Sequence, residues 1–125
     1  MNAQQAVATR RVLVVDDNQQ VADATAKILR SMGHDVRQCY DGTTAMGEAI
    51  RFQPEFILID LVMPGMDGLE LARELHAMFP VSPPKMVALT AFKQPAFRDA
   101  ATWAGFDAYL DKPAKLGELA NLLAG

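Results

Sequence analysis

Short strand-like segments alternate with segments of helical spacing along this chain, and this alternation limits the fold more than any other feature. Strands are expected at 12–15, 34–40, 56–60, 86–90 and 106–110. The apolar runs at 12–15 and 56–59 are typical of strands buried on both faces. Strands that alternate with helices need crossover connections, which produce a parallel sheet covered by helices on both faces. The sequence therefore predicts one α/β domain, a three-layer (βα)5 sandwich.

Helix boundaries are indicated by capping and breaking residues. Asn18 is expected to cap the first helix, Asp67 the third, and Gly33 offers a C-terminal stop. Pro95 falls in the first turn of the fourth helix, where proline is tolerated. Apolar positions at helical spacing are expected to face the sheet, among them Val21, Thr25, Ile28 and Met32 in the first helix and Leu116, Leu119, Leu122 and Leu123 in the last.

Length and composition exclude several classes of protein. A chain of 125 residues, half of them hydrophobic, suits one packed domain, here 11–124 after a flexible lead-in at 1–10. The net charge of −3 disfavours non-specific binding to nucleic acid or to membrane surfaces. No apolar run approaches the roughly 20 residues of a membrane-spanning helix. Cys39 is the only cysteine, which excludes a disulfide framework and favours a cytoplasmic location.

Polar side chains gather at the ends of the expected strands. Asp16 and Asp17 follow the first strand, Asp60 ends the third, Thr90 ends the fourth and Lys112 follows the fifth. In open parallel sheets, ligands bind outside the carboxyl ends of the strands. These five side chains are therefore expected to share one edge of the sheet.

Three neighbouring carboxylates need a counter-charge. Two unit charges about 4 Å apart repel by about 4 kcal/mol at an effective dielectric near 20. A hard divalent cation offsets this repulsion, and Mg2+ suits a site with few carboxylates, several waters and phosphate oxygens. A carboxylate beside the ion can attack phosphorus, while an ammonium and a hydroxyl stabilise the transferring group.

Each of these residues also has a simpler interpretation. An aspartate at a strand end is more often a turn residue or a helix cap, and Asp17 could merely start the first helix. Thr90 could satisfy local backbone groups, and Lys112 could be a solvated loop residue. Only the joint placement of all five favours phosphoryl chemistry.

The sequence resembles the receiver domain of bacterial two-component response regulators over residues 11–123. The motifs that carry this resemblance are VVDDN at 14–18, ILID at 57–60, MPGMDG at 63–68, ALTA at 88–91, AGFD at 104–107 and KP at 112–113. Each motif is weak alone, but their order and spacing are specific. The resemblance implies a flavodoxin-like sheet with strand order 2-1-3-4-5, an order that known members of the family have and that the spacing alone does not give. It also implies a cis Lys112–Pro113 peptide bond.

The resemblance implies a role for each residue of the acidic edge. Asp60 would accept the phosphoryl group. Asp17 and Asp60 would bind Mg2+ directly, with Mn2+ as an alternative ion. Asp16 would act largely through a coordinated water, and the backbone carbonyl of Val62 would supply a further oxygen. Lys112 would pair with the phosphoryl oxygens.

The resemblance further implies a switch and its partners. Thr90 would hydrogen-bond the phosphoryl group, and the ring of Tyr109 would turn inward in response. A histidine kinase or a histidine phosphotransfer protein would be the donor. A downstream protein would bind the face formed by the fourth helix, fifth strand and fifth helix. Such a chain would be a monomer or weak homodimer that catalyses only its own phosphorylation and dephosphorylation, so it would not be an enzyme in the ordinary sense.

Three residues depart from the commonest family pattern. Ala114 follows Lys112–Pro113 at a place where a bulkier apolar residue is frequent, so looser packing is expected beside the switch. Val62 and Phe92 lie two residues after Asp60 and Thr90, at places that flank the phosphoryl group. Both are apolar, which predicts slower self-dephosphorylation than in a relative with polar residues there.

Other functions fit these residues less well. A haloacid-dehalogenase-like phosphatase also uses a strand-end aspartate, but it carries a second aspartate where this chain has Val62. A flavodoxin-like cofactor binder would need a phosphate-binding loop after the first strand, and none follows Val15. A receiver-like binding module that is never phosphorylated is the main alternative. His34 and His76 lie away from the acidic edge and are given no part in phosphoryl transfer.

Overall fold

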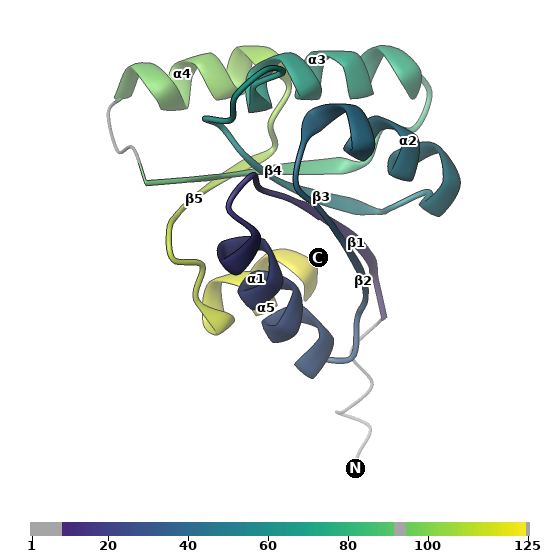
Figure 1. Ribbon diagram of the computed structural model, residues 1–125, viewed down its shortest axis with the longest axis vertical. Coiled ribbons are helices and arrows are strands. Elements are labelled where there is room, and N and C mark those ends of the chain that lie inside the picture. The colour runs from purple at the N-terminus through teal and green to yellow at the C-terminus, as the bar shows by residue number, and fades with distance from the viewer. Residues whose placement is uncertain (1–8, 92–94, 125) are drawn as a thin grey trace.

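A five-stranded parallel sheet forms the centre of the molecule, and the computed structural model describes residues 9–91 and 95–124 (Figure 1). The strand order is β2-β1-β3-β4-β5, which confirms the predicted topology. The strands are β1 (Arg11–Val15), β2 (Asp35–Cys39), β3 (Phe56–Asp60), β4 (Lys85–Thr90) and β5 (Ala108–Asp111).

Helices cover both faces of this sheet (Figure 1). They are α1 (Gln19–Ser31), α2 (Gly42–Phe52), α3 (Gly68–Met78), α4 (Pro95–Ala104) and α5 (Leu116–Ala124). The buried residues of α1 and α5 pack with one face of the sheet, and those of α2, α3 and α4 pack with the other. The expected three-layer sandwich is therefore confirmed.

The inner strands are buried on both faces, as their apolar runs predict. In β3, Ile57 and Ile59 point toward α2 and α3, whereas Phe56 and Leu58 point toward α1 and α5. All five β3 residues are buried. Burial of an aliphatic side chain of this size contributes about 1.5–3 kcal/mol, so these strands are a main source of stability.

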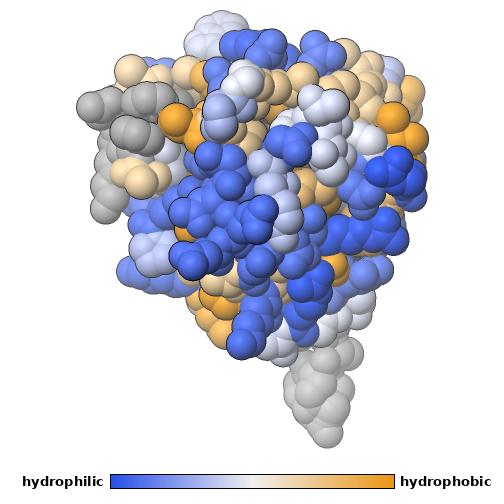
Figure 2. All heavy atoms as spheres, in the orientation of Figure 1, coloured by the Kyte–Doolittle hydropathy of each residue, from blue (hydrophilic) through white to orange (hydrophobic). Residues whose placement is uncertain are grey.

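The surface around α1 is polar. Hydrophilic residues cover much of the face shown in Figure 2. The exposed side chains of α1 include Gln19, Gln20, Asp23, Lys27 and Arg30. Among the described residues, no helix has the length and apolar character needed to cross a bilayer.

The helix caps are as expected. The Asn18 side chain accepts a hydrogen bond from the Val21 amide, and the Asp67 side chain accepts one from the Glu70 amide. Gly33 has a φ of 94°, a left-handed conformation suited to the turn after α1. The Lys112–Pro113 bond is cis, which confirms the expectation from the resemblance.

The expected apolar stripes of α1 and α5 were partly wrong. In α1 the fully buried side chains besides Thr25 are Ala22, Ala26 and Leu29, while Ile28 is only half-buried. Small alanines allow this helix to approach the sheet closely, so its buried face is rotated from the stripe of larger residues. In α5, Leu116 is 55% exposed because it begins the helix at the surface.

The predicted start of the fifth strand was also wrong, by two residues. Phe106 lies between α4 and β5, and its amide donates to the Ala101 carbonyl in the last turn of α4. Gly105, with a φ of 103°, makes the turn between helix and strand. The Phe106 side chain is buried, as those of the inner strands are, so its apolar character alone does not distinguish it from a strand residue.

Gly68 fixes the approach of α3 to the end of β3. A Cβ atom at this position would lie 2.3 Å from the Asp60 carbonyl oxygen and 2.8 Å from the Leu61 Cα. Both neighbours are backbone atoms, which cannot move aside as a flexible side chain can. The Gly68 amide also donates to the Leu61 carbonyl, so the close approach is part of the turn itself.

We predict that Gly68→Ala destabilises the fold by about 2–3 kcal/mol, because the added methyl group overpacks a backbone contact. Gly117→Ala is the matched control, since a Cβ in α5 at this position would meet no atom of the described residues within 4 Å. The control should be neutral or stabilising by up to about 1 kcal/mol. Urea unfolding of both variants measures this difference, and equal stability of the two would contradict the steric account.

Candidate functional site

The carboxyl ends of the strands bring three aspartates together. Asp16 and Asp17 follow β1, and Asp60 ends β3, the neighbouring strand. Each offers a carboxylate oxygen, and these oxygens lie within 4.8 Å of one another. Asp16 and Asp60 are 2% and 7% exposed, whereas Asp17 lies at the surface.

Lys112 reaches across the sheet edge to two of these carboxylates. Its Nζ lies 2.6 Å from Oδ2 of Asp16 and 3.3 Å from Oδ2 of Asp60. The cis bond to Pro113 follows directly, in the segment that leads from β5 to α5. One ammonium group therefore lies between two buried carboxylates, and a third carboxylate stands beside them.

Backbone amides hold the other carboxylate oxygens. Oδ1 of Asp60 accepts a hydrogen bond from the Val62 amide at 3.2 Å. Oδ1 of Asp16 accepts one from the Asn18 amide at 3.0 Å. These contacts fix the orientation of both side chains, and they leave the Oδ2 atoms directed toward Lys112.

The site shifts the proton affinities of its charged groups. Burial, followed by the neighbouring Asp16 carboxylate, raises the pKa of Asp60 to about 6, although Lys112 and the Val62 amide oppose the shift. Burial opposes ionisation of Lys112, but its contacts with Asp16 and Asp60 outweigh burial and raise the pKa of the ammonium group. Lys112 therefore stays charged at neutral pH, and Asp60 ionises only above its usual range.

This shift has a consequence for stability. Because the folded protein holds the Asp60 proton more tightly than the unfolded chain, the protonated side chain favours folding. That contribution is complete below the ordinary pKa of 3.8 and is lost as the pH rises through about 6. At neutral pH the ionised Asp60 carboxylate therefore costs folding free energy, and a cation beside it would reduce this cost.

The donor set fits a hard divalent cation. The clustered side chains of the described residues offer carboxylate oxygens, and the exposure of Asp17 leaves room for water ligands. Few carboxylates with several waters is the arrangement that Mg2+ prefers in sites that also bind phosphate. Val62 lies next to this cluster, through the contact of its amide with Asp60.

Thr90 and Tyr109 lie on the side of the site nearest α4. Thr90 ends β4 and is fully buried, and Tyr109 is half-buried on the edge strand β5. The Arg98 guanidinium of α4 lies over the Tyr109 ring, 4.6 Å from its centroid. Burial raises the pKa of Tyr109, with Arg98 and a hydrogen bond with Thr90 acting against it. The two expected switch residues are therefore in contact with each other.

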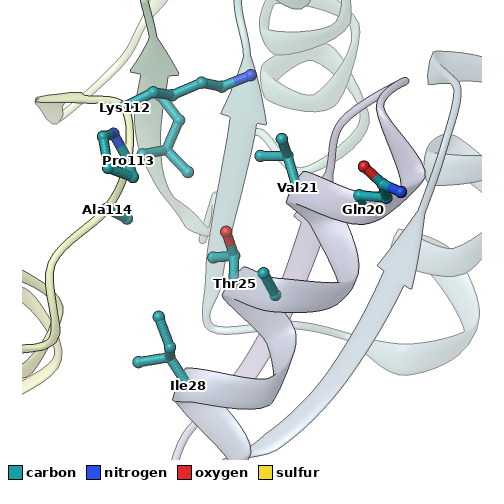
Figure 3. A pocket seen from close by; sticks show the side chains of 9 residues that line it. Gln20, Val21, Thr25, Ile28, Lys112, Pro113 and Ala114 are labelled. Atoms are coloured by element: carbon teal, nitrogen blue, oxygen red, sulfur yellow. The ribbon is translucent and has the colours of Figure 1, made fainter.

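A groove of about 210 Å3 runs beside Lys112 (Figure 3). Val21, Thr25 and Ile28 of α1 line one side, and Pro113 and Ala114 line the other. The Lys112 side chain extends past the groove, with its ammonium group away from the wall that Ala114 forms (Figure 3). The short side chain of Ala114 leaves this space open.

The structure adds two residues that the sequence analysis missed. Asn18 was expected only as a helix cap, yet its amide also orients Asp16. Arg98 carried no signal, because its contact with Tyr109 depends on how α4 packs beside β5. Phe92, which was expected to flank the phosphoryl group, lies outside the described residues.

Solved structures of other proteins share the fold of this chain over nearly its whole length. The chemotaxis protein CheY4 of Vibrio cholerae superposes with a TM-score of 0.85 at 24% identity, covering 93% of this chain and 97% of that one. The signal receiver domain of a response regulator from Bermanella marisrubri gives a TM-score of 0.81 at 30% identity, covering 92% and 95%. A CheY-like receiver domain protein from Methanospirillum hungatei JF-1 gives 0.83 at 26% identity, covering 93% and 91%.

The family comparison extends over nearly the whole chain. The sequence model of the response regulator receiver domain family matches residues 12–124. This range contains the three clustered aspartates, Thr90, Tyr109 and Lys112. The chain therefore belongs to the family of response regulator receiver domains, the signal-receiving modules of two-component signalling.

Proposed function

We propose that this chain accepts a phosphoryl group on Asp60 and transmits the signal through a protein-binding face. The observation that carries this proposal is the placement of Asp60 within ion-pair distance of Lys112 and beside Asp16. A buried carboxylate with an ammonium group and a cation site next to it is suited to phosphoryl transfer.

The transfer step is a displacement at phosphorus. A carboxylate oxygen of Asp60 forms a bond to phosphorus while the bond between phosphorus and the donor breaks, and the leaving group keeps the electron pair. Asp60 must be ionised to attack. Neutral pH lies above the pKa of Asp60, which is about 6, so the carboxylate form predominates. Its fixed orientation, through the Val62 amide, reduces the entropy cost of reaching the reactive geometry.

Residues around Asp60 stabilise the transferring group. Lys112 is placed to pair with phosphoryl oxygens as they approach Asp60. Thr90 supplies a hydroxyl at the end of the next strand. Asp16, Asp17, Asp60 and the Val62 carbonyl would hold Mg2+, or Mn2+ in its place. The bound ion would supply positive charge that neutralises the carboxylates and the phosphoryl oxygens.

The readout in this proposal runs through Thr90 and Tyr109. A dianionic group on Asp60 attracts the Thr90 hydroxyl and changes what the Tyr109 ring contacts. The affected face consists of α4, β5 and α5. Trp103 of α4 is 88% exposed, and exposed tryptophan is favoured as an anchor for a protein partner.

The same proposal sets the cellular role of the chain. Its donor would be a histidine kinase or a histidine phosphotransfer protein in the bacterial cytoplasm. It would turn over no external substrate, act as a monomer or weak homodimer, and bind no nucleic acid or membrane. Phosphatase activity is disfavoured because Val62 occupies the place where a general acid would be needed.

Acetyl phosphate provides the direct test. With Mg2+ present, intact-mass measurement should show one phosphoryl adduct on the wild-type chain and none on Asp60→Asn. Removal of Mg2+ with EDTA should abolish the adduct, because the carboxylates and phosphoryl oxygens would then repel each other. Asp67→Asn is a matched control, since Asp67 caps α3 and should leave the adduct in place.

Absence of an adduct on the folded wild-type chain would contradict the proposal. It would favour the second candidate, a receiver-like binding module that is never phosphorylated. The search would then turn to constitutive partners of the face formed by α4, β5 and α5. An adduct that persists on Asp60→Asn would show that another residue accepts the group.

The lifetime of the phosphorylated form is expected to depend on Val62, whose side chain is 45% exposed beside Asp60. An apolar side chain cannot orient water for attack on the phosphoryl group. We predict that Val62→Asn shortens the half-life by roughly five-fold, which is the effect of one hydrogen bond of about 1 kcal/mol. The intact mass of phosphorylated protein, followed over time after donor removal, measures this half-life.

Val81→Asn is the matched control for this prediction. The same chemical change is made there at a side chain that is 95% exposed in the segment between α3 and β4. The control should leave the half-life unchanged. Equal half-lives of wild type and Val62→Asn would show that this position does not govern attack by water.

A further inference from the structure

A buried histidine lies at the end of the sheet opposite to the aspartate cluster. His34 precedes β2, in the turn that follows α1, and is 6% exposed. Its Nδ1 lies 3.1 Å from the amide nitrogen of Arg10, the residue before β1. The proposed phosphoryl chemistry gives this side chain no part.

The hydrogen bond fixes the protonation state of the ring. An amide can only donate, so Nδ1 of His34 must be the unprotonated nitrogen, and the ring proton resides on Nε2. That Nε2 is buried and has no hydrogen-bond partner among the residues that the structure describes. A second proton would convert Nδ1 into a donor that faces the Arg10 amide, and the hydrogen bond would be lost.

Arg10 connects His34 to three other elements. Its carbonyl accepts from the Asp35 amide at the start of β2, and its Nε donates to the Leu123 carbonyl near the end of α5. Its guanidinium also lies 3.5 Å from the Glu55 carboxylate, just before β3. We call this set, Arg10, His34, Asp35, Glu55 and Leu123, the basal junction.

The charged groups around the His34 ring, taken together, do not favour its protonation. The Arg10 guanidinium acts against protonation of His34, and the Glu55 carboxylate acts for it but is shared with both Arg10 and Arg11. From α1, Arg30 is bound to the Val36 carbonyl and the Gln38 side chain. The α5 residues on this side, Ala120, Asn121 and Ala124, carry no charge.

A cavity beside the ring offers a place for it to move. It measures about 440 Å3 and is lined by Met32, His34 and the three α5 residues Ala120, Asn121 and Ala124. A ring that leaves the Arg10 amide could enter this space and meet water there. Gly33, at a φ of 94°, lies directly before His34 in the turn that would have to adjust.

We propose that His34 is a proton-sensitive catch that closes the basal junction when neutral and opens it when protonated. Protonation breaks the Arg10–His34 hydrogen bond, moves the ring into the adjacent cavity and loosens the start of β1 and β2 against the end of α5. The central strand β3 and the aspartate cluster keep their structure. This inference does not depend on phosphorylation of Asp60.

The direction of the pH dependence follows from the burial of the ring. Burial, and then the Arg10 guanidinium, lower the pKa of His34 below its ordinary value of 6.5. The closed junction therefore binds the proton more weakly than the open one. Closure is fully favoured above the ordinary pKa and is lost as the pH falls below it toward the lowered value.

Hydrogen exchange of the full chain tests the catch at single amides. The amides to follow are those of Arg10 and Asp35 in the junction and those of β3 as a report on global unfolding. Rates are compared at pH 7.5 and 5.5 after correction for intrinsic exchange. Every protein carries Asp60→Asn, because the Asp60 carboxyl titrates near 6 and would otherwise change global stability in the same range.

With His34 present, the protection of the Arg10 and Asp35 amides should fall by up to about tenfold between pH 7.5 and 5.5, while β3 keeps its protection. His34→Gln should remove this pH dependence, because its amide oxygen can still accept from Arg10 but does not titrate. His76→Gln is the matched control at the only other histidine. It should leave the pH dependence intact, since His76 contacts the Gly105 carbonyl on the other face of the sheet.

The proposal would be overturned by the same pH dependence in His34→Gln as with histidine, or by its loss in His76→Gln. If His34→Gln does not fold, the ring resonance of His34 in the parent protein provides the test, assigned by comparison with His76→Gln. A midpoint below 6.5 that is shared by the Arg10 amide resonance would support the catch. A midpoint at or above 6.5, or an Arg10 amide that ignores the titration, would overturn it.

Discussion

Two buried carboxylates share a single ammonium group, and the candidate site is organised around this interaction. Lys112 lies 2.6 Å from Asp16 and 3.3 Å from Asp60, while Asp17 adds a third negative charge nearby. One positive charge cannot neutralise three negative ones, so this edge of the sheet keeps a net negative charge. In the proposed function a divalent cation would offset this negative charge, and with Lys112 it would allow a phosphoryl group to approach Asp60.

The rest of the fold holds these charges in place. Parallel pairing brings the ends of β1 and β3 side by side, and the apolar residues of both strands are buried under helices on both faces. Gly68 lets α3 begin directly against the Asp60 carbonyl. The basal junction closes the opposite end of the sheet through Arg10 and His34. The two ends carry different chemistry, an aspartate cluster in which the pKa of Asp60 is raised and a buried histidine whose Nδ1 accepts a hydrogen bond.

Much of this could be predicted from the sequence because the determining signals are local. The apolar run of β3, the cap at Asn18 and the strand-end aspartates each depend on a few adjacent residues. The buried face of α1 could not be predicted in this way, because it is set by how closely Ala22 and Ala26 approach the sheet. Arg98 over Tyr109, the groove beside Ala114 and the Arg10–His34 bond likewise join segments far apart in the chain. Their geometry depends on packing, which spacing alone does not encode.

The uncompensated charge around Asp60 is the central feature of the site, and a carboxyl NMR titration measures its effect on the pKa of Asp60 directly. With 13C-labelled aspartate and no divalent cation, Asp60 should titrate near pH 6. Saturating Mg2+ should move its midpoint to lower pH, because the ion favours the carboxylate. An Asp60 carboxyl that titrates at its ordinary value of 3.8 and does not respond to Mg2+ would contradict the account.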